Sequence, residues 1–212
     1  MNFLAHLYLG PRDPQRLLGS MLGDFVKGPI AGMELPPGVR EGIWLHRQID
    51  AFTDAHPQVG LSKARVSPLR RRYAGIMVDM FYDHMLARNW QRFEDQPLRQ
   101  FTDRAYADLM SNQHLMPDNA RRVISQMAAH DWLGSYARIE SMHQALDNMA
   151  RRFTRQTALP GAASELEADY EQFQQDFLAF MPEVTAFALA QAARLDTEGD
   201  ALISGSPSSP RV

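Results

Sequence analysis

The segment from Tyr73 to Trp90 constrains the fold more than any other part of the chain. It is apolar on nearly every face of a helix, which is typical of a helix buried at the centre of a protein. Elsewhere apolar residues recur every three or four positions, whereas no stretch alternates convincingly between apolar and polar residues as a half-buried strand does. The 212 residues can bury one sizeable core. The sequence therefore predicts an all-α protein, a single-domain helical bundle.

Proline and glycine residues divide the chain into the expected elements. Asp13 and Pro14 form a typical helix start, because Asp accepts bonds from the first amides and Pro tolerates the first helical position. Met181 and Pro182 are expected to break the chain between its last two helices. The expected elements are a strand or short helix at 1–9, helices at 14–27, 39–55, 57–65, 73–90, 97–109, 117–132, 135–152, 162–180 and 182–195, a loop at 29–38, and a disordered tail at 203–212 after a domain of residues 1–202.

Composition excludes several classes of protein. A hydrophobic content of 45% and a charged content of 22% are ordinary for a globular protein, and the net charge of −3 gives no reason to expect nucleic-acid binding. The absence of cysteine excludes disulfides, thiolate nucleophiles and cysteine-based zinc sites, and it fits a reducing compartment. No run approaches the roughly 18 apolar residues of a membrane span. The N-terminal apolar run lacks a basic region and is broken by His6, so a signal peptide is rejected and a cytoplasmic protein is expected.

Three polar residues interrupt the apolar segment at its centre. Asp79 and Asp83 lie one helical turn apart on the same face, and His84 follows directly. Ionised carboxylates in a buried helix need a cation or dedicated hydrogen-bond donors. Arg47 or Arg72 could provide a structural ion pair, whereas two carboxylates beside a histidine favour a metal site or an acid–base site.

A second group of polar residues lies on other predicted helices. His46, Asp50 and Asp54 follow one another at four-residue intervals, so they share one helix face. An imidazole and carboxylates there suit Mn²⁺, Fe²⁺ or Zn²⁺, although a polar surface stripe has the same spacing. His6 lies among apolar residues, where a histidine is either a hydrogen-bonded core residue or a functional one. Asp24 lies beside the apolar stripe of an earlier helix, so the candidates come from several helices, as a helical metallohydrolase requires.

Basic residues gather near the middle of the chain without an acidic residue among them. They are Lys63, Arg65, Arg70, Arg71 and Arg72. Such a cluster is either a solvated patch or a docking surface for a phosphate group or an acidic partner, because the guanidinium fork matches phosphates and carboxylates.

Motifs of other enzyme classes are absent from the sequence. It contains no P-loop, dinucleotide fingerprint, nucleophile elbow or His-Glu-x-x-His motif. His130 and Asp131 form an adjacent His–Asp pair like the metal-binding pair of HD-type hydrolases. The pair lies near a predicted helix end, before Trp132-Leu133-Gly134, so capping or packing is favoured there.

Several motifs, in matching order, together resemble one family. They are Met1-Asn2-Phe3-Leu4-Ala5-His6-Leu7, Leu22-Gly23-Asp24-Phe25-Val26-Lys27-Gly28, Gly42-Ile43 with Leu45-His46-Arg47 and Ile49-Asp50, Phe52-Thr53-Asp54 with His56-Pro57, and Arg72-Tyr73-Ala74-Gly75-Ile76 with Asp79 and Tyr82-Asp83-His84. The chain resembles the acyl carrier protein phosphodiesterase family, also called holo-acyl-carrier-protein hydrolases, up to about residue 195.

The resemblance implies a fold, a metal and a reaction. The fold is all-helical and distantly related to the HD phosphohydrolases, and the metal is a divalent cation, typically Mn²⁺. The reaction hydrolyses the phosphodiester between 4′-phosphopantetheine and a serine of holo-acyl carrier protein, which is the protein substrate. In contrast to ordinary HD enzymes, the first half of this chain has no adjacent His–Asp pair and carries Asp83-His84 in reversed order.

Roles for the candidate residues follow from the resemblance together with their chemistry. The candidate metal ligands are Asp24, His46, Asp50, Asp79 and Asp83. The candidate catalytic groups are His6, Asp24 and His84, of which either histidine could protonate the leaving serine oxygen or orient the water. The candidate phosphate- or partner-binding residues are Lys27, Arg47, Arg70, Arg71 and Arg72. Asp54 is given a supporting or helix-end role. The alternatives are an HD-like phosphohydrolase acting on a nucleotide or another small phosphoester, and a non-catalytic helical binding protein.

Overall fold

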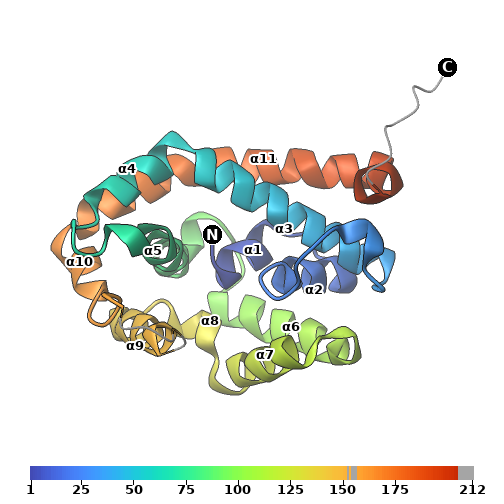
Figure 1. Ribbon diagram of the computed structural model, residues 1–212, viewed down its shortest axis with the longest axis horizontal. Coiled ribbons are helices and arrows are strands. Elements are labelled where there is room, and N and C mark those ends of the chain that lie inside the picture. The colour runs from blue at the N-terminus through green and yellow to red at the C-terminus, as the bar shows by residue number, and fades with distance from the viewer. Residues whose placement is uncertain (152, 154–156, 205–212) are drawn as a thin grey trace.

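The protein is all-α, as the sequence predicts. The structure, a computed structural model, describes residues 1–151, 153 and 157–204 (Figure 1). Within these residues there are α-helices and short 3₁₀ helices but no strand. The α-helices are α1 (Phe3–Leu9), α2 (Pro14–Leu22), α3 (Pro37–Ala55), α4 (Pro57–Arg65), α5 (Ala74–Arg88), α6 (Leu98–Ser111), α7 (Asp118–His130), α8 (Trp132–Ser135), α9 (Ile139–Ala150), α10 (Ala163–Ala168) and α11 (Tyr170–Ser204). The short 3₁₀ helices are η1 (Ile30–Gly32), η2 (Arg71–Tyr73), η3 (Trp90–Arg92) and η4 (Gln113–Leu115).

The helices pack around α1 and α5, which contact each other inside the molecule. The long helix α11 runs along one edge with α3 and α4 beside it, and α2 packs against α3 (Figure 1). Most side chains of α5 are buried, which confirms the prediction of a central helix at this segment. The N-terminal segment, which fitted a strand or a helix, forms α1 and lies against α5.

Local sequence signals explain several helix ends. Asp13 is the N-cap of α2, and its carboxylate accepts hydrogen bonds from the amides of Gln15 and Arg16, as expected. His56 caps α4 by accepting a bond from the amide of Gln58. Helices α2 and α3 approach closely where Gly19 of α2 meets Gly42 of α3. A side chain at either glycine would collide with the backbone of the other helix.

The predicted break at Met181 and Pro182 is wrong. Pro182 lies inside α11, where it lacks the amide that would bond to the preceding turn. Its neighbours Phe180 and Val184 are fully buried, and the Phe180 ring packs against Phe52 and His56 at the end of α3. Tertiary packing therefore outweighs the local cost of the proline. The predicted helix at 162–180 is instead divided into α10 and α11 at Asp169.

Of the two roles favoured for the His130–Asp131 pair, capping or packing, capping is confirmed for Asp131. Asp131 adopts a left-handed conformation with φ of 45°, which ends α7 after His130. Its carboxylate accepts a hydrogen bond from the amide of Gly134 at 3.2 Å and so caps α8. The pair thus divides what the sequence predicts as one helix reaching Trp132.

The C-terminal part of the chain is described to Ser204, where α11 ends. The predicted tail overlaps the last two residues of this helix, and residues 205–212 of the prediction lie outside the described part. Among the described helices, none is both long enough and apolar enough to cross a membrane.

Candidate metal centre

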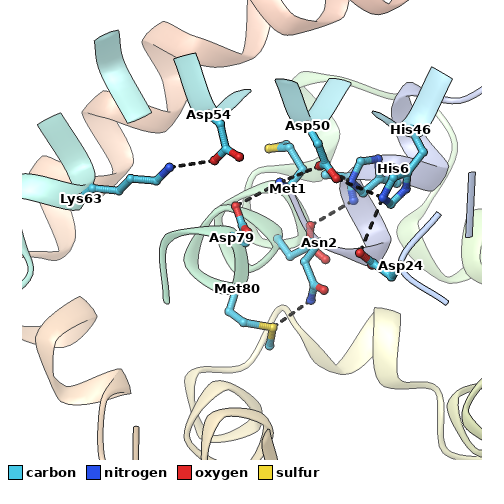
Figure 2. Close-up of polar contacts among 12 residues, drawn as sticks. Met1, Asn2, His6, Asp24, His46, Asp50, Asp54, Lys63, Asp79 and Met80 are labelled. Atoms are coloured by element: carbon cyan, nitrogen blue, oxygen red, sulfur yellow. Dashed lines mark hydrogen bonds and ion pairs between the residues drawn. The ribbon is translucent and has the colours of Figure 1, made fainter. Parts of the chain in front are cut away.

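Two histidines from different helices form the centre of a polar cluster (Figure 2). His6 on α1 and His46 on α3 are both almost completely buried, and their rings stack with centroids 3.7 Å apart. Asp50, one turn after His46, reaches both rings. One of its oxygens lies 3.0 Å from Nε2 of His6, and the other lies 3.1 Å from Nε2 of His46. The two imidazoles and this carboxylate therefore converge on one place.

Asp24 adds a second carboxylate on the open side of the cluster. It follows the end of α2, and its Oδ1 lies 3.6 Å from Nε2 of His46. Its side chain is 44% exposed, whereas the two histidines are enclosed. The close approach of α2 and α3 puts Asp24 there. Gly23 is required as well, because a side chain at that position would collide with the His46 ring.

Asp79 joins the cluster through the N-terminal amine. The amine of Met1 is buried and lies 3.0 Å from Oδ1 of Asp79 and 3.5 Å from Oδ1 of Asp50. Burial raises the pKa of Asp79 more than the neighbouring amine lowers it. Asp79, which the sequence nominates as a candidate metal ligand, therefore borders the cluster, and Figure 2 draws its contact with the Met1 amine rather than with the histidine rings.

The two histidines differ in the effect of their surroundings on the pKa. Burial lowers the pKa of His6 to about 4, with a further contribution from the neighbouring His46. Burial also lowers the pKa of His46, but its contacts with Asp24 and Asp50 raise it more, to about 9. Burial raises the pKa of Asp50, yet its contacts with both histidines hold it well below the ordinary value. Asp50 thus stays ionised and needs positive charge nearby.

The donor atoms of this cluster fit a divalent cation. One ring nitrogen each from His6 and His46 and a carboxylate oxygen of Asp50 lie within 4.8 Å of one another. Nδ1 of His46 lies 2.7 Å from the carbonyl of Ser20 and must donate to it, which directs Nε2 toward the carboxylates. Imidazole nitrogens with carboxylate oxygens suit Mn²⁺, Fe²⁺ or Zn²⁺. A bound cation would balance the negative charge of Asp24 and Asp50, which a protonated His46 balances without it.

Asp83 and His84, which the sequence also nominates, are directed elsewhere. Both carboxylate oxygens of Asp83 accept backbone amides, from Leu4 at 2.8 Å and from Ala5 at 3.0 Å, at the start of α1. Burial raises the pKa of Asp83 to about 7, although these two bonds oppose the shift. Nδ1 of His84 bonds to the carbonyl of Tyr136 at 2.7 Å. The structure does not bring these two side chains into the cluster.

The remaining candidates lie on α3 and in the loop between α2 and α3. Arg47 donates to the carbonyls of Gly28 and Val26, so it holds the loop that follows Asp24. Lys27 is exposed in that loop. Asp54 pairs with Lys63 at 2.8 Å on the surface.

The basic cluster divides into paired and exposed residues. Arg65 pairs with Asp176 at 2.8 Å, and Arg70 pairs with Glu165 at 3.0 Å. Arg71 and Arg72 are exposed in η2. Only part of the predicted surface is therefore open to a partner.

Sequence reasoning missed the groups that orient the site. The Ser20 carbonyl fixes the His46 ring, and Gly23 leaves space for that ring. The sequence did carry a signal, because glycines recur around α2 and α3 at Gly19, Gly23 and Gly42. Backbone carbonyls have no sequence signal of their own, since every residue has one.

Comparison with known proteins agrees with the resemblance. The family described as acyl carrier protein phosphodiesterase matches residues 1–184. A protein of Serratia proteamaculans named acyl carrier protein phosphodiesterase is 37% identical over 185 residues, which cover 87% of this chain and 95% of the relative. Proteins of the same name from Salmonella agona and Yersinia enterocolitica are 35% and 34% identical, over 92% and 89% of this chain and 98% and 97% of their own.

No solved structure matches the chain, so the predicted likeness to HD phosphohydrolases stays a prediction. The family match and these relatives each cover most of the chain. The chain belongs to the acyl carrier protein phosphodiesterase family.

Proposed function

We propose that the protein is a metal-dependent phosphodiester hydrolase. Its substrate is holo-acyl carrier protein, and its products are apo-acyl carrier protein and free 4′-phosphopantetheine. The observation that carries the proposal is the convergence of His6, His46 and Asp50, in a chain whose relatives are named for this activity. These residues supply nitrogen and oxygen ligands in one partly enclosed place.

His6, His46 and Asp50 hold the cation in this proposal, with Asp24 beside them, and Mn²⁺ is the expected metal. When bound, a divalent cation polarises a phosphoryl oxygen and lowers the pKa of water. Burial makes the neutral form of His6 dominant at neutral pH, which leaves a ring nitrogen free to act as a ligand.

Asp24 has the exposure that a proton acceptor needs. Burial raises its pKa, but its contact with His46 lowers it more, so the carboxylate stays ionised. An ionised carboxylate on the open side of the cluster can orient a water and take its proton during attack on phosphorus. Lys27, exposed three residues later, is the candidate partner for the non-bridging phosphate oxygens.

Arg71 and Arg72 are the proposed docking residues for the carrier protein. Both are exposed, and the neighbouring Leu69 is 74% exposed. Acyl carrier proteins are strongly acidic, so exposed arginines beside an apolar side chain offer a complementary surface. Lys63 and Arg65 are engaged with carboxylates of this chain and contribute less.

The proposal is tested by chelation followed by metal replacement. The purified protein is treated with a chelator, and conversion of holo- to apo-acyl carrier protein is followed by mass spectrometry. We expect turnover to disappear on chelation and to return with Mn²⁺. The released 4′-phosphopantetheine should equal the apo-protein formed.

The same assay separates the alternatives. A panel of nucleotides and small phosphoesters is offered beside the carrier protein. Turnover of the small esters without the carrier would favour the HD-like phosphohydrolase. Absence of bound metal and of any metal-dependent turnover would favour a binding protein.

A further inference from the structure

We propose that a cavity beside the metal cluster receives the pantetheine arm of the substrate. The inference rests on the proposed function, because it names where one part of that substrate lies. The cavity has a volume of about 290 Å³ and lies between the start of α1, α5, α8 and α9. Its size is near the lower end of small-molecule sites, so it suits a slender arm.

The cavity shares a wall with the metal cluster. Asn2 and Phe3 line it and begin the helix that carries His6. Met80 lines it too and directly follows Asp79, whose carboxylate borders the cluster. Figure 2 shows Asn2 and Met80 in contact below the cluster, on the side of the pale yellow segment of the chain.

A second contact connects the cavity to the phosphate side of the cluster. The ring of Phe3 stacks on the ring of Phe25, with centroids 6.1 Å apart and nearly parallel planes. Phe25 follows Asp24 directly. A substrate with its phosphate at Asp24 and His46 therefore has the cavity within reach of the pantetheine that extends from that phosphate.

The lining has the chemistry of a neutral, amide-rich ligand. On α9, four residues at helical spacing face the cavity: Ser141, Gln144, Ala145 and Asn148. They offer a hydroxyl and two amides, which pair with the amides and hydroxyl of pantetheine. Apolar groups lie on the same lining, including Trp132, and suit the dimethyl group and the methylene chain.

Charge and access agree with this occupant. Among the described residues, the lining contains no Asp or Glu, and its basic residues His130 and Arg138 are exposed. Gln144 and Asn148 are exposed as well, so the cavity opens to solvent. An arm tethered to a carrier protein can enter from outside while the carrier stays on the surface.

The test measures binding of pantetheine itself, without phosphate or carrier, so that it does not depend on hydrolysis. Titration is followed by the fluorescence of Trp132, with Trp132→Phe identifying the signal. We expect saturable binding by the wild type. Ala145→Phe, which fills the cavity, should weaken it at least about tenfold and raise the KM for holo-acyl carrier protein by a similar factor. Ala193→Phe, on an exposed part of α11, is the matched control and should change neither value.

Two safeguards keep the outcome decisive. If Ala145→Phe fails to fold by circular dichroism, Gln144→Leu with Asn148→Leu replaces it, since both positions are exposed. Absence of pantetheine binding by the wild type, or unchanged binding in the folded variants, overturns the inference. Hydrolysis of holo-acyl carrier protein without pantetheine binding would leave the proposed function in place. Pantetheine binding without hydrolysis of holo-acyl carrier protein would contradict the proposed function but would support pantetheine binding in the cavity.

Discussion

Two groups of acidic and imidazole side chains lie close together in this protein and differ in what their polar atoms contact. His6, His46 and Asp50 direct their polar atoms toward one another. Asp83 and His84, on the central helix α5, direct theirs to groups that already satisfy them. Both groups contain acidic and imidazole side chains. His6, His46, Asp83 and His84 are buried, whereas the Asp50 side chain is 38% exposed.

The difference teaches that burial of a carboxylate does not by itself indicate a functional site. Asp83 is fully buried because two backbone amides at the start of α1 bond to it, which makes it a helix cap. Asp50 instead contacts the imidazoles of both His6 and His46. Convergence of ligand atoms, rather than burial, distinguishes the candidate site.

The largest expected effect tests the converging group. Asp50→Asn should lower the turnover of holo-acyl carrier protein at least about a hundredfold, because it removes the carboxylate that contacts both histidines. Turnover is measured by mass spectrometry of the carrier, and bound metal by elemental analysis. Asp54→Asn, one turn further along α3 and exposed, is the matched control and should keep nearly full turnover. Equal turnover in both variants would contradict the assignment of Asp50 to a catalytic site.

Asp83 should affect stability and its pH dependence instead. Its pKa of about 7 in the folded protein exceeds the ordinary 3.8, so the folded state holds a proton that the unfolded state releases between these values. Stability is therefore greatest below this window and falls as pH rises through it, by up to about 4 kcal/mol. Asp83→Asn stays neutral, so its stability relative to wild type should improve between pH 4 and pH 8.

The measurement for Asp83 is chemical unfolding of both proteins across this range in the presence of a chelator. A chelator keeps metal binding from contributing to the comparison. A constant difference between the two proteins at every pH would contradict the assignment. Loss of turnover in a folded Asp83→Asn protein would place the residue in the site after all.

His84 tests the same contrast with a smaller effect. Its ring contacts the carbonyl of Tyr136 and the hydroxyl of Tyr170, so His84→Gln should cost about 1 kcal/mol of stability. Turnover of the folded variant should stay within about threefold of wild type, a change far below that for a removed ligand. A hundredfold loss would show that the contrast between the two groups is wrong.

The smallest expected effect concerns the arginines of the basic cluster, some of which are paired with carboxylates while others are exposed. Arg70 is paired with Glu165, whereas Arg71 is exposed. Arg71→Glu should raise the KM for the carrier several-fold at low salt, and the difference should shrink at high salt because surface charges are screened. Arg70→Gln should instead lower stability with little change in this salt dependence. Steady-state kinetics at two ionic strengths and thermal unfolding separate the two results.

Much of the fold could be predicted because local signals agreed with the packing. The all-α class, the cap at Asp13, the central helix α5 and the cap at Asp131 all follow from spacing and residue type. The prediction of a break at Pro182 is wrong because the presence of a proline indicates only that one backbone amide is missing from the helix. The contacts that keep α11 continuous are made with other helices, for example that of Phe180 with Phe52 on α3.

The sequence alone determined which residues share a helix face, because a four-residue spacing fixes that for His46 and Asp50. It equally put Asp79 and Asp83 on one face. Only the tertiary structure decided what each face meets. The approach of α1 brings His6 to His46 and at the same time offers two amides to Asp83. Those contacts join residues far apart in the chain, and helical spacing contains no information about them.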